Sequence, residues 1–266
     1  MSLPHIHGQA LPAGDSPERA AAKETLWRLS AAAFSHPNPE LQEAFASGRF
    51  HQAFQEAWWA LTRQAWPESP ASPDFATLEA GYIIAFLHGR KGKPLASLLA
   101  GEYEALLAGH TRPVFMLNVT AFYRHFGLQA ATQDEGHHDE PDHLASMLEF
   151  LAVLSHLEAR ALARDQDASP YRRAQRDFLR RHLLGLLQAI RERLREQDGL
   201  ADLDPTLRQL VLDLPDFAER LATELEARVG RYRDPDAEAG SGRLAGQARP
   251  DARTDTGRVV DQDLWG

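Results

Sequence analysis

The chain has 266 residues, of which 43% are hydrophobic, enough to bury a sizeable core. Its formal net charge of -9 and isoelectric point near 5.7 argue against a general attraction to nucleic acid or anionic lipid, and favour cationic partners. Because the chain contains no cysteine, disulfides, thiolate metal ligands and a cysteine nucleophile are excluded.

The beginning of the chain carries no recognisable targeting segment. Residues 1–7 lack a basic region, an apolar region and a twin arginine, so we expect a cytoplasmic protein with residues 1–14 as a flexible leader. The apolar run at 82–87 is far shorter than the ~20 residues that a membrane span requires. We therefore expect no membrane span.

Helical patterns fill the first half of the chain. Ser16 is placed to cap a helix whose first turn contains Pro17. Apolar spacing and intervening turn signals predict further helices over residues 39–46, 49–66, 74–87, 95–108 and 112–126. Gly127 is expected to end the last of these helices as a C-terminal cap.

The second half continues the helical pattern after a polar stretch. Residues 128–140 are expected to form a hinge between two lobes, and further helices are predicted over residues 141–165, 170–197, 203–212 and 217–229. No strand pattern is present. The sequence therefore predicts an all-α domain over residues 15–233, followed by a tail at 234–266 whose Gly, Asp and Arg content favours disorder.

An acidic turn at residues 139–143 leads into the helix predicted after the hinge. Asp139 suits the helix cap, Pro141 the first turn and Asp142 the answering position of a capping box. His143 is not explained in this way, because we expect an imidazole to add nothing to a helix start. Two interpretations stay open for it: a histidine hydrogen-bonded to a local group, or a reachable binding contact.

A metal site is one alternative function for the same region. His137, His138, Asp139 and His143 are potential ligands, and a helical metal-dependent hydrolase would use them together. However, neither a His-Glu-x-x-His motif nor a helical His-x-x-x-His pair accompanies them. We therefore expect neither a catalytic site nor a bound metal.

The arginine-rich helix at 171–195 offers a second alternative. Arg172, Arg173 and Arg176 could contribute to a phosphate-binding face for nucleic acid. Acidic residues such as Asp177 and Glu192 interrupt the run, and no aromatic residues are interleaved with it. This favours a salt-bridged surface, and no nucleic-acid partner is expected.

Three segments stand out in chain order: residues 122–128 (FYRHFGL), 140–145 (EPDHLA) and 148–151 (LEFL). Together they resemble the TorD/DmsD/NarJ family of molybdoenzyme maturation chaperones. Residues 174–179 (AQRDFL), followed by His182 and Leu183, resemble the branch that serves type II enzymes of the dimethyl sulfoxide reductase family. The similarity spans roughly residues 26–225.

The resemblance implies an all-helical, non-catalytic protein without a cofactor of its own, which can form homodimers. Its partner would be the immature catalytic subunit of a molybdoenzyme, often bound at a twin-arginine leader and held back from folding or export until the molybdenum cofactor is inserted. The implied client-binding residues are Tyr123, Phe126, Glu140, Pro141, Asp142 and His143. Carboxylates beside an apolar groove would suit such a leader, because carboxylates bind arginine in bidentate geometry.

Overall fold

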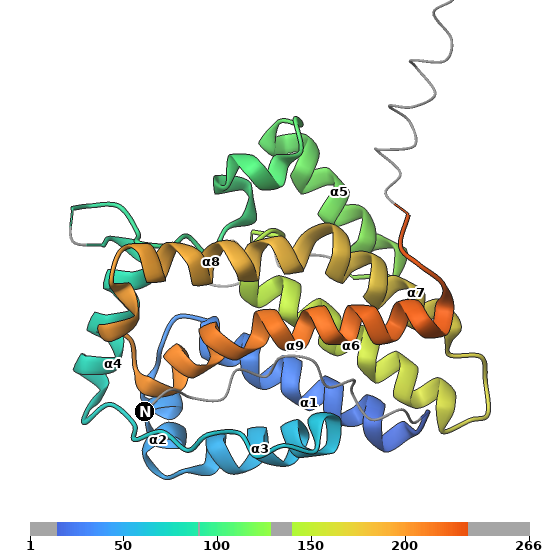
Figure 1. The fold of residues 1–266 in the computed structure, drawn as a ribbon, viewed down its shortest axis with the longest axis horizontal. Helices are drawn as coiled ribbons and strands as arrows, with labels where there is room; N and C mark the ends of the chain where they lie inside the picture. The colour runs from blue at the N-terminus through green and yellow to red at the C-terminus, as the bar shows by residue number, and fades with distance from the viewer. Residues whose placement is uncertain (1–14, 90, 129–139, 234–266) are drawn as a thin grey trace, which may run out of the picture. The chain divides into compact units, whose positions relative to one another are not determined.

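The computed structural model describes residues 15–89, 91–128 and 140–233 (Figure 1). Helix α1 (Pro17–Phe34) begins where Ser16 accepts a hydrogen bond from the backbone of Arg19, so the predicted cap is confirmed. Helix α2 (Pro39–Ala46) begins in the same way, with Asn38 as cap, and α3 (Arg49–Thr62) follows Gly48. Helices α1 and α2 begin where predicted, and α3 begins at the predicted residue 49 but ends at Thr62 instead of residue 66.

The region before the predicted hinge is less regular than expected. Helix α4 (Phe75–Tyr82) continues into a π-helical turn, Ile83–Leu87, and helix α5 spans Arg112–His125. The helix predicted over 95–108 is wrong: only the short 3₁₀ turns Ala100–Glu102 and Glu104–Leu107 form there. Leu99 has extended backbone and forms an antiparallel bridge with His143, which is incompatible with a continuous helix.

The C-terminal half consists of longer helices: α6 (Leu144–Leu162), α7 (Ser169–Phe178), a π-helical turn at Leu179–Leu183, α8 (Leu184–Glu196), a 3₁₀ turn at Gly199–Ala201 and α9 (Pro205–Val229). The predicted break between residues 212 and 217 is wrong, because α9 continues through Pro215. Leu214 and Phe217 are both fully buried. Their packing offsets the ~3 kcal/mol that proline costs inside a helix.

The core is centred on α1, which packs along α6, and on α9 beside them (Figure 1). Trp27 of α1 and Trp58 of α3 both contact the ring of Phe217 in α9, with ring centroids 5.5 and 5.4 Å apart. All three rings are buried, so these contacts join α9 to two helices near the beginning of the chain.

A charged cluster is buried between α1, α6 and α7. Lys23 forms an ion pair with Glu158, which also accepts hydrogen bonds from Arg172 at 2.9 Å and from Gln175 at 2.8 Å. Burial alone would raise the pKa of Glu158, but the charge of Lys23 and these hydrogen bonds hold it below its usual value. The cluster therefore places a carboxylate and its cationic partners inside the core.

The all-α prediction is confirmed, since only helices and turns, apart from the single bridge at Leu99, occur among the residues described. The described helices belong to one compact unit that extends to Tyr232. The leader at 1–14, most of the hinge and the tail at 234–266 lie outside the described residues. The division into two lobes stays a prediction.

Candidate functional site at the start of α6

The turn before α6 is held by backbone contacts to the loop at residues 98–101. Asp142 is fully buried, and its Oδ2 accepts a hydrogen bond from the backbone N–H of Gly101 at 2.8 Å. The carbonyl oxygen of Asp142 accepts from Ala100 at 3.0 Å, and the N–H of Leu144 donates to Leu98 at 2.8 Å. Asp142 thus fixes a loop more than forty residues earlier in the chain.

His143 is the N-cap of α6. Its Nδ1 accepts a hydrogen bond from the backbone N–H of Ala145 at 3.2 Å. The expectation that its imidazole contributes nothing to the helix start is therefore wrong, and so is the placement of Pro141 inside the first helical turn. Asp139, the expected cap, lies outside the described residues. His143 is half-buried, so capping does not remove it from the surface.

Tyr123 connects α5 to the same turn. Its hydroxyl donates a hydrogen bond to the carbonyl oxygen of Pro141 at 2.7 Å. Burial raises the pKa of Tyr123 well above its usual range, and the negative charges of Asp142 and Glu149 add to this effect, so the hydroxyl stays protonated as a donor. The 140–143 turn is therefore anchored on two sides, by the 98–101 loop and by α5.

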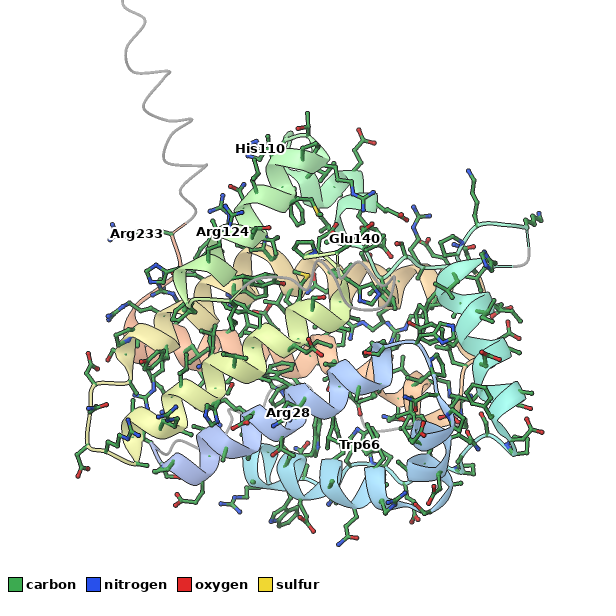
Figure 2. All side chains as sticks on the ribbon, turned by 180° about the vertical axis from the view of Figure 1, so that it is seen from behind. Arg28, Trp66, His110, Arg124, Glu140 and Arg233 are labelled. Atoms are coloured by element: carbon green, nitrogen blue, oxygen red, sulfur yellow. The ribbon has the colours of Figure 1, made fainter. Side chains whose placement is uncertain are left out.

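Two more of the predicted residues lie at the surface of this region. Glu140, labelled in Figure 2, forms an ion pair with Arg112 at the start of α5, and both side chains are about two-fifths exposed. The half-buried ring of Phe126 contacts that of Phe150 in α6, with centroids 5.9 Å apart. Tyr123 contacts the same ring at 4.8 Å.

The six predicted residues are therefore brought together along the start of α6, but they divide into two groups. Asp142 and Tyr123 are buried and hold the backbone. The other four are half-buried and have surface that a partner can reach, namely Phe126, Glu140, Pro141 and His143. The motif alone could not predict that Asp142 is buried, because its hydrogen bond with Gly101 is a contact between residues far apart in the sequence.

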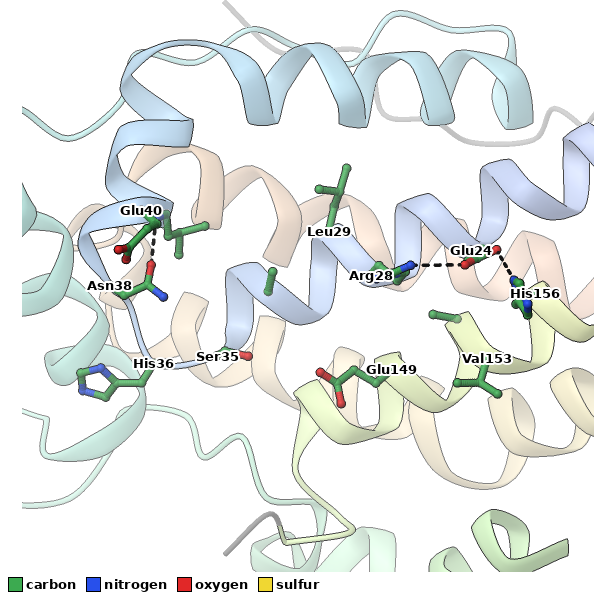
Figure 3. Close-up of a pocket in the computed structure, with 13 residues that line it drawn as sticks. Glu24, Arg28, Leu29, Ser35, His36, Asn38, Glu40, Glu149, Val153 and His156 are labelled. Carbon is green, nitrogen blue, oxygen red and sulfur yellow. Dashed lines mark hydrogen bonds and ion pairs between the residues drawn. The ribbon is translucent and has the colours of Figure 1, made fainter. Parts of the chain in front are cut away.

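Two hollows lie close to these elements, whereas the sequence suggested an apolar groove without naming the residues that line it. The larger, here called the α1–α6 groove, has a volume of about 1000 Å³ and is lined by α1, α2 and α6, including Leu29, Leu41, Glu149 and Val153 (Figure 3). The smaller, of about 440 Å³, lies between α5 and α7 and includes Phe126. A possible signal was the small residues that line the larger hollow from two helices, Ala32 and Ala152.

The arginine-rich face of α7 and α8 is a network of ion pairs. Arg180 binds Glu219 at 2.6 Å and Glu226 at 3.0 Å, and Arg191 binds Asp216 at 2.8 Å. Arg172 and Arg176 also have carboxylate partners. The prediction of a salt-bridged surface is confirmed for Arg180 and Arg191, whereas Arg172 and Arg176 are themselves buried.

The predicted metal alternative falls mainly on residues that cannot be placed. His137, His138 and Asp139 lie outside the described residues, while His143 caps α6. Among the residues that are described, no cluster of three or more histidine, aspartate or glutamate side chains is arranged to hold a metal ion. Nor does the described part of the chain include a helix that is long and apolar enough to cross a membrane.

The chain belongs to the nitrate reductase delta subunit family, whose profile matches residues 47–190. It is 50% identical over 252 residues to the dimethyl sulfide dehydrogenase assembly chaperone protein of Rhodovulum sulfidophilum, covering 95% of each chain. It is also 38% identical over 176 residues to the selenate reductase assembly chaperone protein of Thauera selenatis, covering 64% of this chain and 86% of that one.

A third relative is the perchlorate reductase assembly chaperone protein of Dechloromonas aromatica, 30% identical over 182 residues that cover 65% of this chain and 78% of that one. No solved structure matches the chain. These relatives confirm the resemblance found in the sequence, including its type II branch. The protein is an assembly chaperone for a molybdoenzyme of the dimethyl sulfoxide reductase family, and not an enzyme itself.

Proposed function

We propose that this chain is the dedicated assembly chaperone of a dimethyl sulfide dehydrogenase. The observation that supports this client most strongly is the 50% identity to the chaperone of that enzyme, which extends over 95% of both chains. The chaperone would bind the immature catalytic subunit in the cytoplasm and keep it open until the molybdenum cofactor is inserted. A twin-arginine leader on the client would be released for export only after that step.

We further propose that the client contacts the surface at the start of α6. Glu140 offers a carboxylate to an arginine of the client, in competition with its present partner Arg112. His143 and Phe126 provide a half-buried imidazole and an aromatic edge beside it. In this account Asp142 and Tyr123 position the recognition surface and do not contact the client.

The test is co-purification of the catalytic subunit of dimethyl sulfide dehydrogenase with the tagged full-length chain. We expect the wild type to retain the subunit, and the double variant Glu140→Ala/His143→Ala to retain much less of it while remaining folded. The matched control is Glu192→Ala/His88→Ala, which removes the same two groups from exposed positions elsewhere. Failure of the wild type to retain the subunit would contradict the proposed client, and equal retention by both variants would contradict the proposed surface.

A further inference from the structure

A small hollow lies among charged side chains where the beginning of α1 and the end of α9 meet α6 and α7. Its volume of about 10 Å³ is room for one water-sized species. This ion-pair hollow has a charged lining formed by Arg19, Lys23, Glu158, Arg172, Glu224 and Arg228. Side chains from four helices therefore face one polar space, which is separate from the surface proposed for the client.

The cations around the ion-pair hollow outnumber the carboxylates. Every cation has a carboxylate partner: Arg19 with Glu224, Lys23 with Glu158, Arg172 with Glu158 and Asp15, and Arg228 with Glu224 and Asp15. Four cations thus share three carboxylates within the described part of the chain, which is a formal excess of one positive charge. The lining side chains are at most one-fifth exposed. An excess charge that is shielded from water is costly unless a counterion accompanies it.

Arg172 has a donor that these ion pairs do not use. The residue is only 8% exposed, and its Nε and Nη1 donate to Glu158 and Asp15. Its Nη2 is buried and has no hydrogen-bond partner among the residues that the structure describes. A buried N–H group without an acceptor destabilises the folded chain. An acceptor in the hollow beside Arg172 would therefore stabilise it.

The protonation of two further cations also favours negative charge in the hollow. Burial lowers the pKa of Lys23 below its usual value, and the opposing effect of Glu158 does not cancel this. Burial likewise lowers the pKa of Arg228. Both side chains would hold their protons more strongly beside an additional negative charge.

An anion suits this lining better than a water molecule does. Water also has two protons to donate, and the carboxylate oxygens of Glu158 and Glu224 already accept hydrogen bonds from the surrounding cations. A chloride ion only accepts hydrogen bonds, is only slightly larger than water, and carries the one negative charge that offsets the excess. Polyatomic anions such as sulfate are too large for a hollow of about 10 Å³.

We propose that the ion-pair hollow binds one chloride ion, with Nη2 of Arg172 as a donor and with Lys23 and Arg228 beside the ion. The bound ion connects α1 and α9 to α6 and α7, and it requires the folded chain, because the four helices meet there only after folding. No client takes part in this site, so the proposal stands or falls independently of the proposed function.

Thermal unfolding of the full-length chain measures this binding, because an ion that binds only the folded state raises the unfolding temperature. Sodium gluconate, whose anion is too large for the hollow, is replaced stepwise by sodium chloride at constant ionic strength. We expect the midpoint of unfolding to rise by about 5 °C at a hundredfold excess of chloride over the dissociation constant. A midpoint that does not depend on chloride would overturn the proposal.

The substitution Ser16→Asp distinguishes the site from a general salt effect. Ser16 lines the hollow and caps α1, and aspartate is an equally good cap that brings a carboxylate to the hollow. The variant should unfold at nearly the same temperature in chloride and in gluconate. The matched control is Asn38→Asp at the cap of α2, where proline and glutamate follow as they do in α1. It should respond to chloride like the wild type, and equal responses of the wild type and Ser16→Asp would overturn the proposal.

Anomalous diffraction locates the ion directly. Crystals of the full-length chain grown with bromide in place of chloride should show an anomalous peak in the ion-pair hollow, within hydrogen-bonding distance of Nη2 of Arg172. A water molecule at this position, or bromide bound only at exposed side chains, would show that the hollow is not a halide site.

Discussion

Asp142 and Gly101 form a 2.8 Å hydrogen bond that leaves no space for a side chain at position 101. A Cβ atom added to Gly101 would lie 2.7 Å from Oδ2 of Asp142 and 2.8 Å from Cγ of Arg112. The buried aspartate, a residue of the most informative motif in the sequence, is thus a structural anchor. Its effect on client binding would be exerted through the position of the 140–143 turn.

Asp142→Ala is predicted to lower the free energy of unfolding by about 2 kcal/mol, since a hydrogen bond to a charged group is lost in the interior. Gly101→Ala should also lower the free energy of unfolding, because the added methyl group would push the carboxylate of Asp142 away. Urea denaturation of the two single variants and of the double variant measures their free energies of unfolding. The double variant should be less destabilised than the sum of the singles, and strict additivity would argue against the contact.

The substitution His143→Asn distinguishes the role of His143 as N-cap of α6 from its proposed role in client binding. Asparagine is a good N-cap, so α6 and the free energy of unfolding should be nearly unchanged. Client co-purification should fall, because the imidazole is lost from the surface. A variant that is fully stable and retains the client like the wild type would show that His143 acts only as a helix cap.

Tyr123→Phe is predicted to lower the free energy of unfolding by about 1 kcal/mol. The change removes the hydroxyl that donates to Pro141 at 2.7 Å and leaves the aromatic contact with Phe150 in place. Thermal unfolding of this variant is compared with that of Tyr103→Phe, which removes a hydroxyl that donates to the carbonyl oxygen of Ser97. Reduced client binding in the Tyr123 variant alone would link the anchor to recognition.

Glu158→Gln is predicted to destabilise the fold by about 3 kcal/mol. The substitution preserves shape but leaves Lys23 in the core without its carboxylate and removes one of the carboxylate partners of Arg172, which keeps its ion pair with Asp15. The double variant Lys23→Met/Glu158→Leu should recover part of the loss, because the buried ammonium group is removed together with its partner. Chemical denaturation at pH 7 measures the free energies of unfolding. If Glu158→Gln is as stable as the wild type, the buried cluster does not stabilise the fold as described.

The same cluster predicts a dependence of stability on pH. Because the pKa of Glu158 is lower in the folded chain than its ordinary value of 4.5, its contribution to stability is present above pH 4.5. It is lost as the pH falls from there through the folded pKa. Between pH 5 and pH 3 the wild type should therefore lose more free energy of unfolding than Glu158→Gln. If both proteins lose the same amount over this range, ionised Glu158 does not contribute to stability.

Local signals predicted the helices well where capping decides the boundary. Ser16 with Pro17 begins α1 as the sequence indicated, and α2 begins at residue 39 as predicted. Predictions failed where distant contacts overrule local preference: Leu99 pairs with His143, and the packed face of α9 carries Pro215. Neither the bridge nor the packing of α9 can be recognised from the neighbouring residues in the sequence.

The sequence singled out the turn at 140–143 as the candidate site, and its client-binding role stays a prediction. Which of its residues are buried could not be predicted, because the burial of Asp142 depends on Gly101, forty-one residues earlier. The groove was not predictable either, because Ala32 and Ala152 face it from helices that are far apart in the chain. Each small residue taken alone is typical of an ordinary helix interface.

The proposed function of this chain is to prepare a dimethyl sulfide dehydrogenase for its cofactor. The most direct measurement is the molybdenum content of the catalytic subunit, purified after expression with the full-length chaperone, with the Glu140→Ala/His143→Ala variant or with no chaperone. The account predicts nearly full occupancy with the wild type, reduced occupancy with the variant and little molybdenum without chaperone. Equal molybdenum content in all three preparations would contradict it.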